Sequence, residues 1–257
     1  MAEPMPDRKQ QVVDLLKAIE TGASEPVGVI DLSTYIQHNL AVADGVGGFK
    51  ALQQALQTAS ARVKTIRVFQ DGEYVFAHTE YDVFGPKVGF DIFRFERGKI
   101  VEHWDNLQTA AGPNASGHTM IDGPTAPNEL GRTESNKALV HSFVVEILVN
   151  GRMEKLASYF NGDAYIQHNP LIADGLSGLA NALAAMAKAG IALQYDRIHQ
   201  VLGEGSFVLT VSEGKLGAAP TAFFDLFRVE NGMIAEHWDT IEAIPARNQW
   251  QNSNGKF

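Results

Sequence analysis

Residues 35–48 read YIQHNLAVADGVGG and residues 165–178 read YIQHNPLIADGLSG, with nine identities in 14 positions at a shift of 130 residues. A second pair of segments, 90–105 and 224–239, reads FDIFRFERGKIVEHWD and FDLFRVENGMIAEHWD, with 11 identities in 16 positions at a shift of 134 residues. Similarity of this extent at nearly constant spacing identifies a tandem duplication. The chain therefore contains two copies of one folding unit.

The duplication predicts two domains with separate hydrophobic cores. Solenoid repeats are much shorter and need their neighbours to complete a core, so each copy here should fold around a core of its own. Residues 108–132 are rich in Gly, Pro, Asn and Ser, a composition typical of a linker. We expect the first domain at residues 1–120, the linker at 121–132 and the second domain at 133–257.

Each copy begins with helical patterns and ends with strand patterns. Apolar residues at helical spacing predict helices at residues 7–19, 49–59, 139–148, 151–160 and 179–189. β-Branched and aromatic residues separated by turn signals predict strands in the first copy at residues 63–69, 74–80, 88–95 and 99–105. Helices followed by an antiparallel meander predict an α+β domain.

The composition excludes several classes of partner and site. The 257 residues carry a formal charge of −9, which disfavours binding to nucleic acid or to an anionic membrane surface. No cysteine is present, so disulfides, thiolate metal sites and thiol nucleophiles are excluded. The first residues lack the apolar core of a secretory signal and no segment predicts a membrane span, so we expect a cytoplasmic protein.

The repeated motifs resemble a known family. The pattern YIQHNP followed by ADG, and then FDxFRxExGxIxEHWD, is similar to that of SnoaL-like proteins of the nuclear transport factor 2-like superfamily, in particular the group described as predicted aldol-condensation enzymes. Ketosteroid isomerase and limonene epoxide hydrolase belong to the same superfamily. The resemblance implies two tandem cone-shaped domains of the cystatin-like type, each a curved antiparallel sheet wrapped over N-terminal helices with a pocket at its wide end. It also implies that the two copies pair as an intramolecular pseudo-dimer, with a homodimer as a further arrangement.

The last predicted strand of each copy carries a candidate acid–base pair. Alternate side chains of a strand share a face, so His103 and Asp105 point one way and Trp104 points the other. The same three residue types recur at His237, Trp238 and Asp239. In a sheltered pocket an imidazole can exchange protons near neutral pH, and a carboxylate can orient it or act as the base. The resemblance assigns both aspartates to the last-strand acid or base of SnoaL-type cyclases; the alternative is that these polar residues cap a strand end or contact the other copy.

The YIQHN segments supply further candidates, His38 and His168. By resemblance to ketosteroid isomerase, each His-Asn pair falls where that enzyme carries its general-base aspartate, and an imidazole there could abstract a proton next to a carbonyl. The equal alternative is a histidine bound to backbone at a strand end. Substrate contacts are expected from Tyr35, His78, Trp104, Tyr165 and Trp238.

Two further aspartates, Asp91 and Asp225, lie by resemblance where ketosteroid isomerase places its oxyanion-hole aspartate, a carboxylic acid kept neutral by an apolar site. A protonated carboxyl there would donate a hydrogen bond to an enolate oxygen. The favoured alternative is a structural salt bridge between Asp91 and Arg94 or Arg67. The oxyanion tyrosine of that enzyme has no counterpart at the matching helix.

Cofactors are not indicated by the sequence. His38, His103 and Asp105 could form a two-histidine, one-carboxylate metal set, but no HExxH or thiolate motif supports it, and no glycine-rich phosphate loop or dinucleotide motif occurs. His78 is replaced by Val211 in the aligned strand, so the two pockets should differ. We expect neither a metal nor another cofactor.

These residues together predict a cofactor-free acid–base enzyme that acts on a small carbonyl or polyketide-like substrate, as an aldol-type cyclase, lyase or isomerase. We expect the second copy to hold the intact site, because Leu40 in the first copy replaces Pro170 after the YIQHN segment. A non-catalytic small-molecule-binding or scaffold protein of the same fold is the alternative. A hydrolase like limonene epoxide hydrolase comes third, since it needs an Asp-Arg-Asp arrangement in which the sequence places the arginine only loosely.

Overall fold

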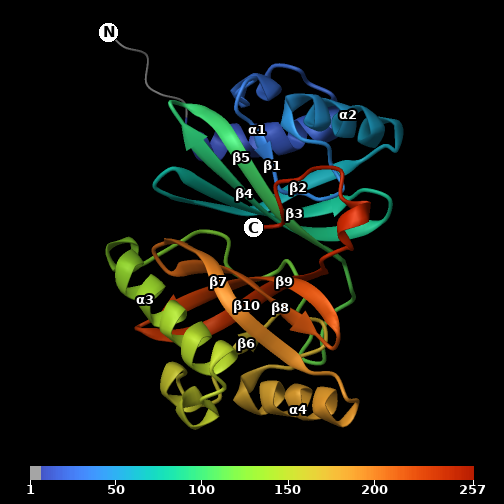
Figure 1. Cartoon of the computed structure of the whole chain (residues 1–257). Coiled ribbons are helices and arrows are strands. Elements are labelled where there is room, and N and C mark those ends of the chain that lie inside the picture. Colours follow the sequence, from blue (N-terminus) through green and yellow to red (C-terminus); the bar gives the residue numbers. More distant parts are fainter. Residues whose placement is uncertain (1–6) are drawn as a thin grey trace. The chain divides into compact units, whose positions relative to one another are not determined.

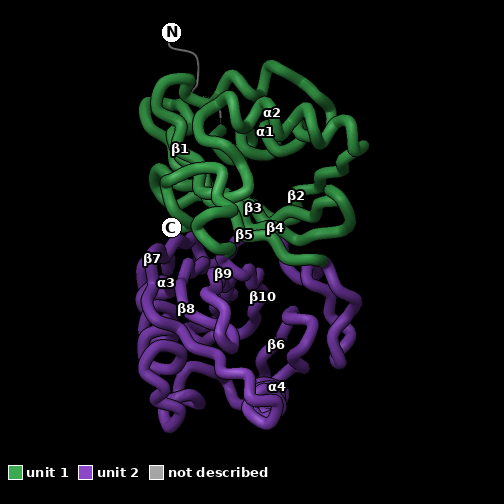
Figure 2. Tube along the Cα trace, turned by 45° about the vertical axis from the view of Figure 1, so that its right-hand side comes forward, with its two compact units in different colours: residues 1–109, 245–257 green, residues 110–244 purple. Residues whose placement is uncertain are grey.

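A computed structural model describes residues 7–257 of the chain. The chain divides into two compact units, one formed by Met1–Thr109 together with Pro245–Phe257 and the other by Ala110–Ile244 (Figure 2). Both units have the same order of elements, as the duplication predicts.

Residues 7–109, the described part of the first copy, form one five-stranded sheet and two α-helices, which lie over one face of the sheet (Figure 1). Its elements are α1 (Arg8–Thr21), a 3-10 turn (Pro26–Val29), β1 (Ile36–Gln37), α2 (Gly45–Thr58), β2 (Arg62–Asp71), β3 (Tyr74–Asp82), β4 (Pro86–Glu96) and β5 (Lys99–Thr109). The strand order is β1-β5-β4-β3-β2. Strands β2 to β5 form an antiparallel meander, whereas β1 pairs parallel with β5.

The second unit repeats this topology. Its elements are α3 (Thr133–Phe143) continued by a π-helical turn (Val144–Val149), a 3-10 segment (Met153–Tyr159), β6 (Ile166–Gln167), α4 (Gly175–Lys188), β7 (Leu193–Glu204), β8 (Phe207–Leu216), β9 (Ala219–Glu230) and β10 (Met233–Ala243). The strand order is β6-β10-β9-β8-β7, with β6 parallel to β10. The α+β prediction is confirmed, and the wholly antiparallel sheet is corrected by the short parallel strand at one edge.

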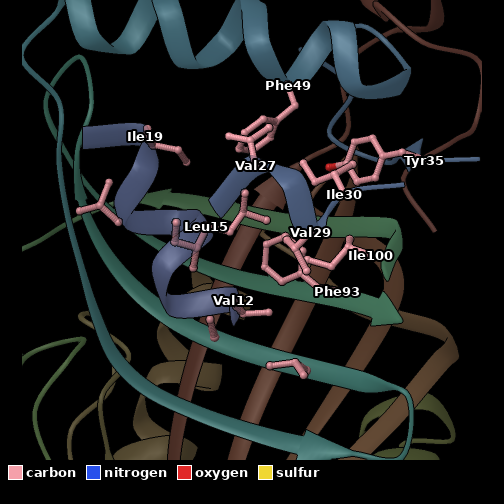
Figure 3. Close-up of a cluster of buried hydrophobic side chains, with 14 of the residues drawn as sticks. Val12, Leu15, Ile19, Val27, Val29, Ile30, Tyr35, Phe49, Phe93 and Ile100 are labelled. Carbon is pink, nitrogen blue, oxygen red and sulfur yellow. The ribbon is translucent and has the colours of Figure 1, made fainter. Parts of the chain in front are cut away.

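Helix α1 shows how the sequence specifies these elements. The Asp7 side chain caps the helix by accepting a hydrogen bond from the Lys9 backbone N–H at 3.0 Å, and Gly22 ends it with a left-handed backbone (φ 75°). The buried face carries Val12, Leu15, Leu16 and Ile19. Figure 3 shows the labelled members of this face pointing toward side chains of the sheet, among them Phe93 and Ile100. Burial of this apolar stripe fixes the helix on the sheet.

The second unit encloses a corresponding core. Phe143 of α3 makes edge-to-face contacts with Phe160 and Phe227, at ring-centroid distances of 5.5 and 5.6 Å. Val140 and Ile147 lie in the same buried cluster. Of the helices in residues 7–257, none combines the length with the apolar composition needed to cross a membrane.

The observed unit boundaries differ from the expected domains at two places. Residues 110–120 belong to the second unit, although they were assigned to the first domain, and residues 245–257 belong to the first unit, although they were assigned to the second. The stretch that follows each last strand therefore folds with the other copy. Residues 121–132, expected as a linker, also belong to the second unit. Composition indicates an irregular segment, but the partner of such a segment is set by long-range hydrogen bonds that composition does not reveal.

The C-terminal segment is held in the first unit by amide side chains. Asn252 donates to the carbonyls of Asn39 and Val42 at 2.8 and 3.0 Å, and Asn254 donates to the Gln37 carbonyl at 3.0 Å and to the Asp44 carboxylate at 2.8 Å. These acceptors lie in and just after β1. The segment therefore supplies donors that the two-residue strand and its following loop lack.

The segment after β5 does the same in the second unit. Asn114 donates to the carbonyls of Gln167 and Ile172 at 2.6 and 2.9 Å, and the Asp174 backbone N–H donates to Ser116 Oγ at 2.9 Å. These acceptors and donors lie in β6 and the loop that follows it, which correspond to β1 and its loop. We call residues 110–120 and 245–257 the exchanged segments, because each folds with the other copy. In both units an asparagine of the exchanged segment donates to the carbonyl of the glutamine in the short strand.

We predict that Asn252→Ala loosens β1 and its loop. Two partly buried carbonyls lose a donor. Such a loss costs about 1 to 3 kcal/mol, so amide exchange in residues 36–44 should be roughly tenfold faster. Hydrogen–deuterium exchange with mass spectrometry measures this, with residues 166–174 as the internal reference. Gln249→Ala, an exposed position in the same segment, serves as the control; equal exchange in both variants would contradict the anchoring role.

Candidate active site

Sheet register brings two carboxyl groups together in each unit. Asp91 of β4 lies directly opposite Asp105 of β5, and Asp225 of β9 lies directly opposite Asp239 of β10. Residues paired in this way have Cβ atoms about 4.5 to 5.5 Å apart. A histidine two positions before the second aspartate shares its face in each unit, at His103 and His237. The predicted His–Asp face is therefore present in both copies.

Both clusters face a cavity. In the first unit a cavity of about 330 Å³ is lined by Asp91, His103 and Asp105 at its polar end. Apolar side chains from α1, α2 and the sheet form most of the remaining wall, including Leu16, Ile19, Phe49, Leu52, Leu56, Phe93 and Leu107. A hollow of this size suits a small ligand.

The second unit has a larger cavity of about 410 Å³. Its polar end contains Asp225, His237 and Asp239 together with Tyr165 and Tyr195. Most of the other wall is apolar, including Leu148, Leu179, Met186, Leu193, Phe227 and Ile241. The Asp–His–Asp group of the second copy therefore also lines a cavity.

Short strands β1 and β6 deliver amide side chains to the clusters. In the second unit His237 Nδ1 lies 2.9 Å from Gln167 Oε1 and its Nε2 lies 3.1 Å from Asp225 Oδ1. Asn169 donates from Nδ2 to Asp239 Oδ2 at 2.7 Å. The first unit repeats these contacts through Gln37, His103, Asp91, Asn39 and Asp105. Gln and Asn of the YIQHN motif are site residues that the sequence analysis missed.

Burial and charge perturb the second cluster. Burial raises the pKa of Asp239 to about 6, and the neighbouring Asp225 charge adds to this. Burial alone would lower the pKa of His237, but its hydrogen bond with Asp225 and the charges of Asp239 and Asp225 raise it above the ordinary value. Asp239 Oδ1 is buried without a hydrogen-bond partner among the described residues. One carboxyl oxygen in this cavity is thus left unbonded by the protein.

A tyrosine hydroxyl binds the first aspartate of each cluster. Tyr81 donates to Asp91 Oδ2 at 2.8 Å, whereas Tyr195 donates to Asp225 from 3.2 Å. Burial raises the pKa of both phenols well above the ordinary value, so both stay protonated donors. Asp91 is therefore bound to Tyr81 and His103. The salt bridge with Arg94 or Arg67 that the sequence favoured is not formed among the described residues.

The two tyrosines come from different strands. Tyr81 of β3 pairs with Val63 of β2, whereas the corresponding pair in the second unit is Gly214 of β8 and Tyr195 of β7. Phe223, which corresponds to Gly89 in the first unit, stacks on Tyr195 at a ring-centroid distance of 4.3 Å. A Cβ at Gly89 would lie 2.5 Å from the Tyr81 ring, so the two arrangements exclude each other. Alignment of the two copies could not reveal that both keep this hydroxyl, because Tyr81 aligns with Gly214 and Tyr195 aligns with Val63.

His38 and His168 lie outside the cavities, which corrects their assignment as bases. His38 Nε2 lies 3.0 Å from Glu102 Oε1 and its Nδ1 lies 2.9 Å from the Gly255 carbonyl. His168 repeats this with Glu236 and the Thr119 carbonyl, each at 2.8 Å. Both ring nitrogens are engaged and neither ring lines a cavity. The alternative of a histidine bound to backbone describes them better.

The tryptophans and the glutamates next to His38 and His168 pack against these rings or bind them. Trp104 and Trp238 stack on His38 and His168 at ring-centroid distances of 4.8 and 4.5 Å, on the face away from the cavities. Hydrogen bonds with His168 and Arg228 lower the pKa of Glu236 although burial acts to raise it. Neither tryptophan lines a cavity, so the structure does not place them at a substrate.

Of the remaining residues expected to contact substrate, one lines a cavity and two do not. Tyr165 lines the second cavity, whereas Tyr35 is buried without lining the first. His78 is buried, with Nδ1 2.5 Å from Arg67 and its ring against Phe90, and it does not line the cavity. The replacement of His78 by Val211 therefore does not change the lining of either cavity.

The first cluster contains a cation that the second lacks. Lys256 is buried, and its Nζ lies 3.8 Å from Asp105 Oδ1. It follows Gly255, whose carbonyl binds His38; in the second unit the residue after the equivalent carbonyl of Thr119 is Met120. The exchanged segment of the first unit therefore brings an ammonium to the carboxyl cluster. The exchanged segment of the second unit has the apolar Met120 at the equivalent position.

Each cluster also has the donor types that a divalent cation binds. One ligand atom from each member of Asp91, His103 and Asp105, and likewise of Asp225, His237 and Asp239, lies within 4.8 Å of the others. His118, Asp122 and His168 form a third, less buried group. The set of His38, His103 and Asp105 considered from sequence is not brought together. In the second cluster both nitrogens of His237 already bond to Gln167 and Asp225, and a cation would have to displace one of these contacts.

Comparison with known proteins gives structural matches alone. No protein-family model and no curated protein matches the chain. Matching solved structures include an NTF2-like protein of unknown function from Cytophaga hutchinsonii, with 9% identity and a TM-score of 0.37 over 42% of this chain and 95% of that one. IdmH from Streptomyces antibioticus, described as a candidate polyketide cyclase, matches with 15% identity and a TM-score of 0.34 over 38% and 90%. A candidate ketosteroid isomerase from Kribbella flavida matches with 18% identity and a TM-score of 0.34 over 45% and 87%.

Each match spans less than half of this chain and most of the solved chain. The pairing of the two copies and the cellular compartment stay predictions.

We predict that Asp225→Asn lowers the pKa of His237. The substitution removes a carboxylate whose hydrogen bond and charge raise that pKa, and a loss of this kind shifts a neighbouring pKa by about one to three units. Titration of the His237 imidazole ¹⁵N shifts measures the change. Asp196→Asn, an exposed aspartate on β7, is the control; a pKa of His237 that stays the same in both variants would contradict the coupling.

Proposed function

We propose that the second unit catalyses proton transfer on a small apolar carbonyl compound, with Asp239 as the acid or base. The observation that carries this proposal is the Asp239 carboxyl itself. It lines an apolar cavity, its Oδ1 has no partner among the described residues, and burial raises its pKa to about 6. A general acid or base works best when its pKa lies near the operating pH.

Asp239 is also held in a fixed orientation. Asn169 donates to Oδ2 at 2.7 Å, which leaves Oδ1 as the oxygen with free lone pairs. Ionised Asp239 would take a proton from the carbon next to a bound carbonyl, and the resulting carboxylic acid would return a proton to carbon or oxygen. The same exchange of one proton serves isomerisation, lyase and aldol-type chemistry.

Tyr165 is the candidate donor to the substrate oxygen. Tyr165 lines the cavity, and its hydroxyl accepts a hydrogen bond from Gln167 Nε2 at 3.3 Å. Burial, with the charges of Asp239 and Asp225, raises its pKa well above the ordinary value, so the phenol keeps its proton. A neutral donor aimed at a carbonyl oxygen stabilises the enolate that forms when Asp239 removes the proton.

His237 balances the charge beside the base, and Asp225 holds His237 in place. A charged His237 between two carboxyl groups lets Asp239 ionise without leaving two uncompensated negative charges in the cavity. Tyr195 adds a hydrogen bond to Asp225 and so holds that carboxyl in its own place. We assign His237 and Asp225 to positioning, because the Nε2 of the ring is occupied by Asp225 and its Nδ1 by Gln167.

Two other functions remain as outcomes of the test. A protein that only binds an apolar ligand would need the cavity but not the unpartnered carboxyl, so it predicts full ligand binding without proton exchange. A hydrolase of the limonene epoxide hydrolase type needs an arginine between two aspartates, and none of the described arginines lines either cavity. We therefore do not propose hydrolysis.

We predict that the protein accelerates exchange of α-protons of apolar monoketones such as 2-tetralone in D₂O, and that Asp239→Asn lowers this rate at least about 100-fold, the usual contribution of an acid or base. Proton NMR of the ketone measures the rate. Tyr165→Phe should also lower it, since it removes the oxyanion donor. Asp196→Asn should leave it unchanged.

Three results would contradict the proposal in different ways. Ligand binding without exchange in the wild-type protein would show a binding protein. Exchange that persists in Asp239→Asn would place the base elsewhere. Exchange that is abolished by EDTA and restored by a divalent cation would show that the Asp–His–Asp group works as a metal site.

We also predict that Asp239→Asn stabilises the protein at neutral pH. The pKa of Asp239 is raised to about 6 from 3.8, so its contribution favours folding fully below pH 3.8 and is lost as the pH rises through about 6. At pH 7 burial of the ionised group therefore costs about 2 to 3 kcal/mol. Urea unfolding should show the variant more stable than wild type at pH 7 and similar at pH 4; a difference that does not depend on pH would contradict the raised pKa.

A further inference from the structure

The hairpin between β3 and β4 carries an aromatic ring and a cation at the opening of the first cavity. Phe84 lines that cavity although its side chain is 78% exposed, so it lies at the rim. Its backbone is left-handed (φ 54°), a conformation that costs a bulky residue free energy. Lys87, three residues on, lines the same cavity and is half-buried.

Lys87 has no ionic partner and no side-chain hydrogen bond within residues 7–257, the part of the chain that the structure describes. Its cross-strand neighbours are Tyr81 on β3 and Thr109 on β5, neither of which is acidic. A half-buried ammonium that faces a mostly apolar cavity without a counterion attracts an anionic group of a ligand.

The position of Lys87 sets how far that anionic group lies from the chemistry. Lys87 and Asp91 are four residues apart on β4, which places both on one face and separates their Cα atoms by roughly 13 Å. Gly89 lies between them on the same face and has no side chain. Apolar Phe93 and Leu107 line the same cavity. A ligand could thus extend along an apolar wall from the carboxyl cluster to Lys87.

The second unit lacks both rim residues. Ala218 and Thr221 occupy the positions of Phe84 and Lys87 at a shift of 134 residues. Thr221 Oγ1 donates to the Ala219 carbonyl at 2.8 Å and accepts from the Leu216 backbone N–H at 3.2 Å, so it is committed to the hairpin. The lining of the second cavity contains no lysine or arginine. The two cavities therefore differ in charge at their openings.

We propose that the first cavity binds an elongated apolar compound with a terminal carboxylate, held at the opening by Lys87 and Phe84, whereas the second cavity takes a neutral compound. This inference goes beyond the proposed function, which concerns the second cavity. It follows from one unpartnered ammonium in the first unit and its replacement by a threonine in the second.

Isothermal titration calorimetry with decanoate and 1-decanol tests this selection on the full chain. We expect Lys87→Thr, which installs the residue of the second copy, to weaken decanoate binding roughly tenfold, the effect of losing one charge-assisted hydrogen bond at a partly exposed site. Binding of 1-decanol should not change. Lys87→Arg should keep the preference for decanoate. Neither probe needs to react, so the result is independent of whether the protein transfers protons.

Lys64→Thr is the matched control, because it removes an exposed lysine that does not line the first cavity. Methyl NMR of Leu56 and Leu107 locates decanoate in the first cavity. The proposal is overturned if Lys87→Thr and Lys64→Thr weaken decanoate binding equally, if decanoate binds wild type no better than 1-decanol does, or if decanoate leaves the Leu56 and Leu107 methyl signals unchanged.

Discussion

Two carboxyl groups face each other across neighbouring strands in each unit, inside a cavity with mostly apolar walls. Buried like charges at this distance cannot both ionise without compensation. The sheet register fixes the aspartates and the histidine, and other elements supply the hydrogen bonds that hold these side chains. Strands β1 and β6 are only two residues long, yet each delivers a glutamine to the cluster histidine and is followed by an asparagine that binds the second aspartate. The exchanged segments hold these short strands in place through Asn114, 53 positions from Gln167, and through Asn254, 217 positions from Gln37.

Comparison of the two copies shows which feature of the cluster is constrained. The hydroxyl that binds the first aspartate comes from Tyr81 of β3 in one unit and from Tyr195 of β7 in the other. A glycine replaces the tyrosine on β8, and Phe223 fills the space that Gly89 leaves open in the first unit. Three positions therefore changed while one hydrogen bond was kept. A recent duplication would keep every residue, but here the contact persists although the residue that makes it does not.

Strand alternation and the repeat were enough to predict the α+β fold and the shared face of His103 and Asp105. Each of these follows from local geometry, which sequence pattern encodes directly. His38 could not be placed in the same way, because the observed strand β1 is only two residues long and ends before His38. The tyrosine hydroxyls and the exchanged segments were also missed. Both depend on contacts between distant residues, and periodicity within a segment carries no information about them.

Charge is where the two copies diverge. In the first unit Lys256 lies 3.8 Å from Asp105, and Lys87 stands at the opening of the cavity. In the second unit the corresponding positions are Met120 and Thr221. Burial raises the pKa of Asp239 to about 6, with the Asp225 charge adding to this and the His237 charge and the Asn169 hydrogen bond opposing it. One scaffold thus holds the same Asp–His–Asp cluster in two electrostatic settings, and a second copy in one chain lets each setting exist without loss of the other.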